Sequence, residues 1–395
     1  MARISLPGSG LRFDRSLVVV TLLLLCLSVV LISSASVMEA SVRYADSMYL
    51  VKKHLLAVAA ALLAALVTAA VPTEFWKKYS IHLMAVMIIL LILVLLLGRN
   101  INEARRWLSL GFFNLQPAEL LKLCWIFYFS SYVSRKSAEL RTFKGFLKPL
   151  IFIGIFGFLL LMQPDFGSMV VITMITFCML WIAGVRIFHY LAVGALLAVL
   201  SGLMVVIEPY RMRRVTSFLN PWQDQFGSGY QLTQSLMAFG RGGLFGEGLG
   251  NSIQKMGYLP EAHTDFVTAV LGEELGFAGM CVMIFLEFFI VVKALRLAFR
   301  ILHKNSIFQG YVVLGIGVWF CLQTFINIGA ASGALPTKGL TLPLISYGGS
   351  SLLVCCCAIA VLLRVDYEYR LGLIGKKEAE AERIPENIWG ITRRS

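Results

Sequence analysis

Charge is what this sequence has least of. Only 14% of its 395 residues are charged, whereas 58% are hydrophobic. Soluble globular chains carry about 25% charged residues, so the composition excludes an ordinary soluble domain. Apolar runs of about 20 residues, each long enough to cross a bilayer core of roughly 30 Å, recur between residues 17 and 363. The sequence therefore predicts an all-α polytopic membrane protein.

Motifs for metal binding, nucleotide binding and nucleophilic catalysis are also missing. All eight cysteines fall inside apolar runs, without the spacing of a disulfide framework or a zinc site. The sequence has no H-E-x-x-H, no Walker loop and no nucleophile elbow. The net charge of +13 comes from basic residues between apolar runs, where they set membrane topology, so it does not indicate nucleic-acid binding.

Ten transmembrane helices with both termini cytoplasmic satisfy the bias of Lys and Arg toward cytoplasmic loops. The fifth and sixth are short, but the basic segments 135–148 and 185–188 are both cytoplasmic only if two crossings lie between them. The predicted helices cover residues 17–36, 51–71, 80–98, 118–134, 149–162, 169–184, 189–207, 266–292, 308–332 and 344–363.

One long non-spanning stretch divides the predicted helices. Residues 208–265 form a large extracytoplasmic loop between helices 7 and 8, rich in glycine but also in apolar and aromatic residues. Loops of this length are uncommon unless functional or disordered. We expect a glycine-hinged cap on the outer surface, with a short amphipathic helix near 228–240. The organisation is then an amino tail (1–16), helices 1–7 (17–207), this loop (208–265), helices 8–10 (266–363) and a carboxyl tail (364–395).

Several cations fall on the predicted outer side, against the usual bias. Arg105 and Arg106 lie in the short loop 99–117, Arg213 lies in the large loop, and Lys338 lies in the break between helices 9 and 10. Such residues suit an anionic ligand, because guanidinium and ammonium groups bind phosphate. The alternative is that strong neighbouring helices set the topology and these side chains are merely solvated.

The stretch "PEAHTDFVTAVLGEEL" gathers carboxylates at the start of an apolar run. Asp265 precedes helix 8 and has two readings: an N-cap, which Asp fills well, or a catalytic carboxylate at the outer surface. Capping does not explain His263 or the two glutamates Glu273 and Glu274. Carboxylates inside a span cost about 2.5–3.5 kcal/mol, so these two are expected to face a polar cavity or a partner.

A second polar group begins helix 4, in "QPAELLKL". Glu119 and Lys122 are three residues apart and therefore share one face of the helix. They are expected to pair and to line a wet site, or else to form an ordinary pair at the membrane interface.

Together these features describe an outward-facing site with cations, one well-placed carboxylate and a mobile cap. The matching substrate is an anionic amphiphile with a lipid tail and a phosphate or pyrophosphate head. A lipid-linked sugar transferase fits this description, and so does a transporter whose carboxylate relays protons.

Four blocks of the sequence resemble the SEDS family of cell-wall polymerases, and its cell-division branch most. They are "NEARRWLSLGFFNLQPAELLKL", "QPDFGSMVV", "GYQLTQSLMAFGRGGLFGEGLGNSIQKMGYLPEAHTDFVTAVLGEELGF" and "PTKGLTLPLISYGGSS", in the family's order, within a resemblance that covers about residues 12–375.

This resemblance implies a ten-helix fold and a peptidoglycan glycosyltransferase that polymerises lipid II at the division septum, with inversion at the donor sugar. It assigns the essential aspartate to Asp265. The substrate-binding residues we expect are Arg105, Arg106, Glu119, Lys122, Arg213, His263 and Lys338.

The resemblance also implies the cellular setting. The protein is expected in the bacterial inner membrane at the septum, with its active site facing the periplasm. Its expected partners are lipid II, a class B penicillin-binding transpeptidase of the FtsI type, and divisome proteins of the FtsQ, FtsL, FtsB and FtsN types. No definite cofactor is expected, although a divalent cation such as Mg²⁺ is compatible with a pyrophosphate. A lipid II flippase and a non-catalytic division scaffold are the alternative functions.

Overall fold

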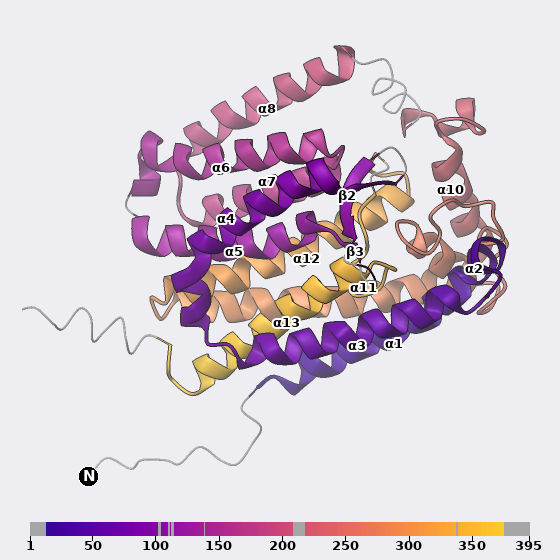
Figure 1. Cartoon of the computed structure of the whole chain (residues 1–395), viewed down its shortest axis with the longest axis horizontal. Helices are drawn as coiled ribbons and strands as arrows, with labels where there is room; N and C mark the ends of the chain where they lie inside the picture. Colours follow the sequence, from indigo (N-terminus) through magenta and orange to yellow (C-terminus); the bar gives the residue numbers. More distant parts are fainter. Residues whose placement is uncertain are drawn as a thin grey trace, which may run out of the picture.

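The computed structural model describes residues 13–101, 104–109, 111, 114–137, 139–207, 218–336 and 339–374. Within these residues, ten long helices run roughly alongside one another (Figure 1). Each overlaps one of the ten segments predicted from the sequence. They are α1 (Arg15–Ala35), α3 (Tyr49–Ala70), α4 (Thr73–Leu97), α5 (Pro117–Lys136), α6 (Phe143–Met162), α7 (Phe166–Ile182), α8 (Ile187–Ile207), α11 (Val267–Leu302), α12 (Ile307–Ala331) and α13 (Gly349–Arg370).

Length and apolar composition make seven of these helices candidate membrane spans: α1, α3, α4, α6, α11, α12 and α13. α7 is apolar but shorter, with 17 residues. α12 and α13 have the most buried spans and lie inside the bundle, whereas α3 and α4 expose large apolar side chains such as Leu66 and Leu96. Exposed apolar side chains along long helices are expected where hydrocarbon, and not water, is the solvent. The chain is therefore a multi-pass helical membrane protein.

Several helix boundaries differ from the predicted ones: α4 begins at Thr73 and not at 80, and α6 begins at Phe143 and not at 149. Two further differences have clear reasons. α11 continues past its apolar run to Leu302, because Lys293, Arg296 and Arg300 are good helix formers whose long stems can cover apolar surface. α13 begins only at Gly349, since the Pro343 region before it is irregular and cannot continue a helix.

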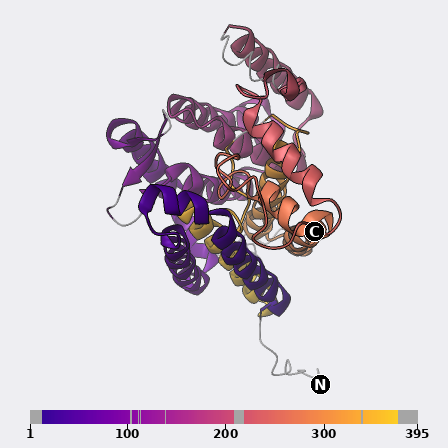
Figure 2. The same ribbon diagram turned by 90° about the vertical axis from the view of Figure 1, so that its right-hand side faces the viewer.

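Except for the turn at Glu139–Arg141, which joins α5 to α6 at the opposite end, the smaller elements gather at one end of the bundle (Figure 1; Figure 2 looks onto this end). α2 (Val37–Tyr44) follows α1, and α10 (Tyr230–Gly242) matches the amphipathic helix predicted over 228–240. A three-stranded antiparallel sheet of β1 (Arg99–Ile101), β2 (Ala104–Ser109) and β3 (Asn114–Leu115) occupies the loop between α4 and α5. Two short 3₁₀ turns, η1 (Glu139–Arg141) and η2 (Pro221–Asp224), complete the described elements.

Candidate functional site

Asp265 lies in the segment that leads into α11, at the end of the molecule that carries α10 and the sheet. Its side chain is partly buried and packs against the backbone of Gly339, where a Cβ atom would stand 2.9 Å from Asp265 Oδ2. α11 begins at Val267 without a side-chain cap. The capping role considered for Asp265 is therefore not observed, and its carboxylate has no hydrogen-bond donor among the described residues.

The surroundings of Asp265 raise its pKa from the usual 3.8 to about 7. Burial is the main cause, because it disfavours the charged form, and the neighbouring carboxylates of Glu261 and Asp165 act in the same direction. Arg106 and His263 oppose this rise in pKa, since positive charge stabilises the carboxylate. A carboxyl group with a pKa near neutrality is suited to accept and release protons at physiological pH.

The two arginines of β2 have different surroundings. Arg106 is half-buried, donates hydrogen bonds to the carbonyl oxygens of Gln163 (3.3 Å) and Pro164, and contributes to the electrostatics of Asp265. Arg105 is exposed and approaches the carbonyl of Leu95 (3.4 Å) at the end of α4. Successive residues of a strand point to opposite faces, so only one of the two can serve a given site.

Glu119 and Lys122 form a buried polar cluster inside the bundle. Lys122 Nζ lies 2.9 Å from Glu119 Oε1 and 2.8 Å from Gln323 Oε1 of α12, and the lysine side chain is fully buried. Gln323 in turn donates to the carbonyl oxygen of Thr341 (2.8 Å). The expected Glu–Lys pair therefore forms, and it links α5 through α12 to the segment that follows Gly339.

His263 joins three parts of the end of the molecule that carries α2 and α10. Its Nδ1 lies 3.0 Å from Glu39 Oε2 of α2, and its carbonyl oxygen accepts a hydrogen bond from the backbone N–H of Tyr347 (3.0 Å). The contact with His263 is the main reason why the pKa of Glu39 is lowered, and Arg43 adds to this effect. The histidine is buried, so it fixes the position of the 260–265 segment.

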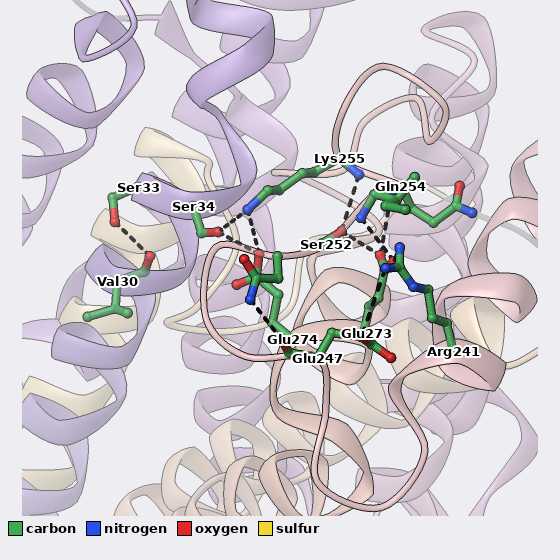
Figure 3. A network of polar contacts seen from close by, with 12 residues as sticks. Val30, Ser33, Ser34, Arg241, Glu247, Ser252, Gln254, Lys255, Glu273 and Glu274 are labelled. Atoms are coloured by element: carbon green, nitrogen blue, oxygen red, sulfur yellow. Dashed lines mark hydrogen bonds and ion pairs between the residues drawn. The ribbon is translucent and has the colours of Figure 1, made fainter.

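The paired glutamates of "GEEL", Glu273 and Glu274, hold residues 243–256, here called the glycine-rich loop, in place (Figure 3). Glu273 accepts hydrogen bonds from Arg241 Nη1 (3.2 Å), Ser252 Oγ and the backbone N–H groups of residues 253 (3.0 Å) and 254 (3.2 Å). Glu274 accepts from Lys255 Nζ (2.7 Å) and from Ser34 Oγ of α1 (2.6 Å). Both carboxylates have partners, as their cost inside an apolar run predicts.

A break in α11 allows the backbone of this loop to join the helix. Gly276 has φ +66° and ψ −167°, so the helical ladder is interrupted there. The freed groups pair with the loop: the N–H groups of 247 and 248 donate to the carbonyls of Glu273 and Glu274 (both 3.0 Å), and the N–H groups of 277 and 278 donate to the carbonyls of 243 (2.9 Å) and 244 (3.0 Å). A Cβ atom on Gly276 would lie 2.3 Å from the nitrogen of Gly246, so this approach requires glycine.

Two adjoining hollows, of about 480 and 410 Å³, open between α1–α2 and the segment 249–262. They share Met38, Lys255 and Met256, and the second is also lined by Glu261 of the Asp265 loop. Their walls are mostly apolar.

Two predicted site residues, Arg213 and Lys338, lie outside the described residues. Within the described ranges, no group of three or more His, Cys, Asp and Glu side chains is placed to hold a metal ion. The sequence interpretation did not single out Gln323 and Asn327 of α12. A polar amide inside an apolar span was the available signal, because such groups must find partners there.

Comparisons with known proteins give a consistent result. The family of cell cycle proteins that groups FtsW, RodA and SpoVE matches residues 14–371. The chain is 50% identical to the "Probable peptidoglycan glycosyltransferase FtsW" of Tolumonas auensis over 361 residues, covering 91% of this chain and 93% of that protein. It is 46% identical to the protein of the same description from Escherichia coli O157:H7, covering 92% and 88%.

Solved structures agree with this similarity. One, described as "Structural coordination of polymerization and crosslinking by a peptidoglycan synthase complex", has a TM-score of 0.76 at 27% identity and covers 91% of this chain and 99% of that one. The crystal structure of the rod shape determining protein RodA of Thermus thermophilus has a TM-score of 0.65 at 26% identity, with the same coverage.

Proposed function

The chain belongs to the FtsW/RodA/SpoVE family of cell cycle proteins, and from this premise we propose that it polymerises lipid II into glycan strands at the division septum. It is a peptidoglycan glycosyltransferase, in agreement with the descriptions of its relatives. The observation that carries the proposed mechanism is Asp265, a partly buried carboxylate packed against Gly339, on which Arg106 acts electrostatically and whose pKa is raised to about 7.

The proposed reaction is a single displacement. Asp265 accepts the proton of the acceptor sugar's 4-hydroxyl, and that oxygen attacks the donor's anomeric carbon. The bond to undecaprenyl pyrophosphate breaks, so the anomeric centre is inverted. Because pyrophosphate is a good leaving group once cations neutralise it, no second carboxylic acid is needed, in contrast to inverting glycoside hydrolases.

We assign the cationic role first to Arg106, which is half-exposed and lies in the electrostatic environment of Asp265. Arg213 and Lys338 complete the proposed set of pyrophosphate ligands, whereas Arg105 lies on the opposite face of β2 and does not belong to it. Lys122 is fully buried and bonded to Gln323, so its contribution is to shape the site from behind. His263, paired with Glu39, positions the segment that carries Asp265. If Mg²⁺ takes part, it would neutralise the pyrophosphate on the same outer surface.

The helical fold and the family support the following proposed setting. All ten long helices cross the inner membrane, both termini are cytoplasmic, and the Asp265 end with α10 faces the periplasm. A class B penicillin-binding transpeptidase of the FtsI type is the proposed partner, supported by the similarity to a structure described as coordinating polymerization and crosslinking. FtsQ-, FtsL-, FtsB- and FtsN-type proteins complete the proposed assembly at the septum.

The test is polymerisation of lipid II by the purified protein in detergent, where no two-sided membrane exists. We expect glycan strands from the wild type and none above a trace from Asp265→Asn, with both proteins monodisperse. A flippase or a scaffold makes no product in detergent, so the absence of wild-type product, with and without the transpeptidase and Mg²⁺, would contradict the proposal.

A further inference from the structure

Asn327 of α12 is a buried amide next to the segment that carries Asp265. Its Nδ2 donates to two backbone carbonyl oxygens, those of Asp265 (3.0 Å) and Leu340 (2.6 Å). These carbonyls belong to segments far apart in the sequence: one leads into α11, and the other lies between α12 and α13. The amide therefore joins the carrier of the carboxylate to the segment beyond Gly339.

The backbone of Gly339 packs against the Asp265 carboxylate, and the hydrogen bonds of Asn327 hold the two segments together there. Asp265 Oδ2 would lie 2.9 Å from a Cβ atom at this position, closer than carbon and oxygen atoms normally approach without a hydrogen bond. The carboxylate thus occupies the space that a side chain would fill. Any shift between the two segments moves the carboxylate relative to the backbone of Gly339.

We propose that Asn327 and Gly339 are positioning residues for the transferase reaction, which together fix the Asp265 carboxylate at the place where it accepts the acceptor's proton. Asn327 sets the separation of the two segments, and Gly339 provides the space. This inference rests on the proposed function of Asp265. Neither residue touches substrate in the proposal, so both act through the position of the carboxylate.

The expected effects are on turnover. Displacement of a reacting group by about 1 Å can cost roughly 10²-fold in rate. We therefore expect Asn327→Ala and Gly339→Ala each to lower kcat about 10- to 100-fold with little change in KM. Asn327→Ala also loosens the packing that keeps the carboxylate from water, and the added methyl group of Gly339→Ala pushes the carboxylate out of this packing. The acid limb of the rate–pH profile should then move to lower pH, because burial is the main reason why the pKa of Asp265 lies near neutrality.

Each of the two substitutions has a matched control variant. Thr324 lies on the same helix, and its buried hydroxyl has no hydrogen-bond partner among the described residues. Thr324→Val therefore removes a buried polar group without breaking a hydrogen bond to either segment. A Cβ atom on Gly348 would meet only ordinary contacts of 3.4 Å or more, so Gly348→Ala repeats the glycine change nearby. Both controls should keep the wild-type profile.

The assay is lipid II polymerisation by the purified full chain across pH 5 to 9, with folding checked by the melting temperature of each variant. A purely structural role would lower the active fraction and leave the acid limb in place. If Asp265→Asn is inactive while Asn327→Ala and Gly339→Ala keep the wild-type rate and limb, the positioning inference is wrong and the proposed function stands. If Asp265→Asn itself is active, the proposed function fails first.

Discussion

The buried ion pair between Lys255 and Glu274 should decide whether the glycine-rich loop stays closed on α11. The lysine side chain is 8% exposed and the carboxylate is fully buried, at 2.7 Å from each other. Removing one partner of a buried pair leaves an uncompensated charge and costs about 3–5 kcal/mol. Lys255→Met and Glu274→Gln should each lower the free energy needed to open the loop by about this amount. The reason is that the pair ties the loop to α11 and, through Ser34, to α1.

The assay is hydrogen–deuterium exchange of the amides of residues 243–256 in the detergent-solubilised protein. A cost of about 3 kcal/mol corresponds to a roughly 10²-fold rise in the open population, and exchange should accelerate by that factor. The double variant Lys255→Met/Glu274→Gln should lose less than the sum of the single changes, since neither charge is then left unpaired.

The exposed pair of Lys52 and Asp46 is the matched control. It has the same type of contact at 2.8 Å, but its side chains are 66% and 41% exposed, so water replaces the lost partner and Lys52→Met should leave exchange unchanged. Wild-type exchange in Lys255→Met, or full additivity in the double variant, would refute the reasoning.

Two further predictions concern stability and the helix break. Because the pKa of Asp265 is raised, the folded state loses stability as pH rises from 3.8 through about 7. Asp265→Asn should therefore melt at a higher temperature than the wild type at pH 8, and this difference in melting temperature should shrink toward pH 4. A difference that does not change with pH would contradict the raised pKa. Gly276→Ala should cost about 1–3 kcal/mol from its positive φ alone and more from the 2.3 Å approach to Gly246, releasing the loop to exchange. Gly184→Ala, with φ +76° and open space around it, isolates the first effect, and equal losses of melting temperature in the two variants would argue against the contact.

Much of the helical architecture could be predicted from the sequence, because an apolar run of bilayer length has few alternatives to a helix. The amphipathic α10 was likewise predictable from local pattern. The end of α11 was not, since hydropathy marks where lipid contact stops and not where hydrogen bonding stops. The sheet of β1–β3 was missed because its strands are short and pair only with one another.

The site was predictable in its residue types but not in its connections. Asp265 and Arg106 stood out as charges next to apolar runs, and the structure brings them into one electrostatic environment. Lys122 stood out equally, yet it is buried behind Gln323, because burial depends on helix packing that a single helix does not encode. Asn327 was missed since its amide nitrogen donates to backbone carbonyls, which carry no sequence signal.

The most direct test of the central claim is the initial rate of lipid II polymerisation by the wild type and Asp265→Asn across pH 5 to 9. The account predicts a wild-type rate that rises through pH 7 to a plateau, and an Asn variant that is slower at pH 8 by about 10²–10⁴-fold and lacks that rise. An Asn variant that polymerises within about tenfold of the wild type, or that keeps the same acid limb, would show that Asp265 is not the base.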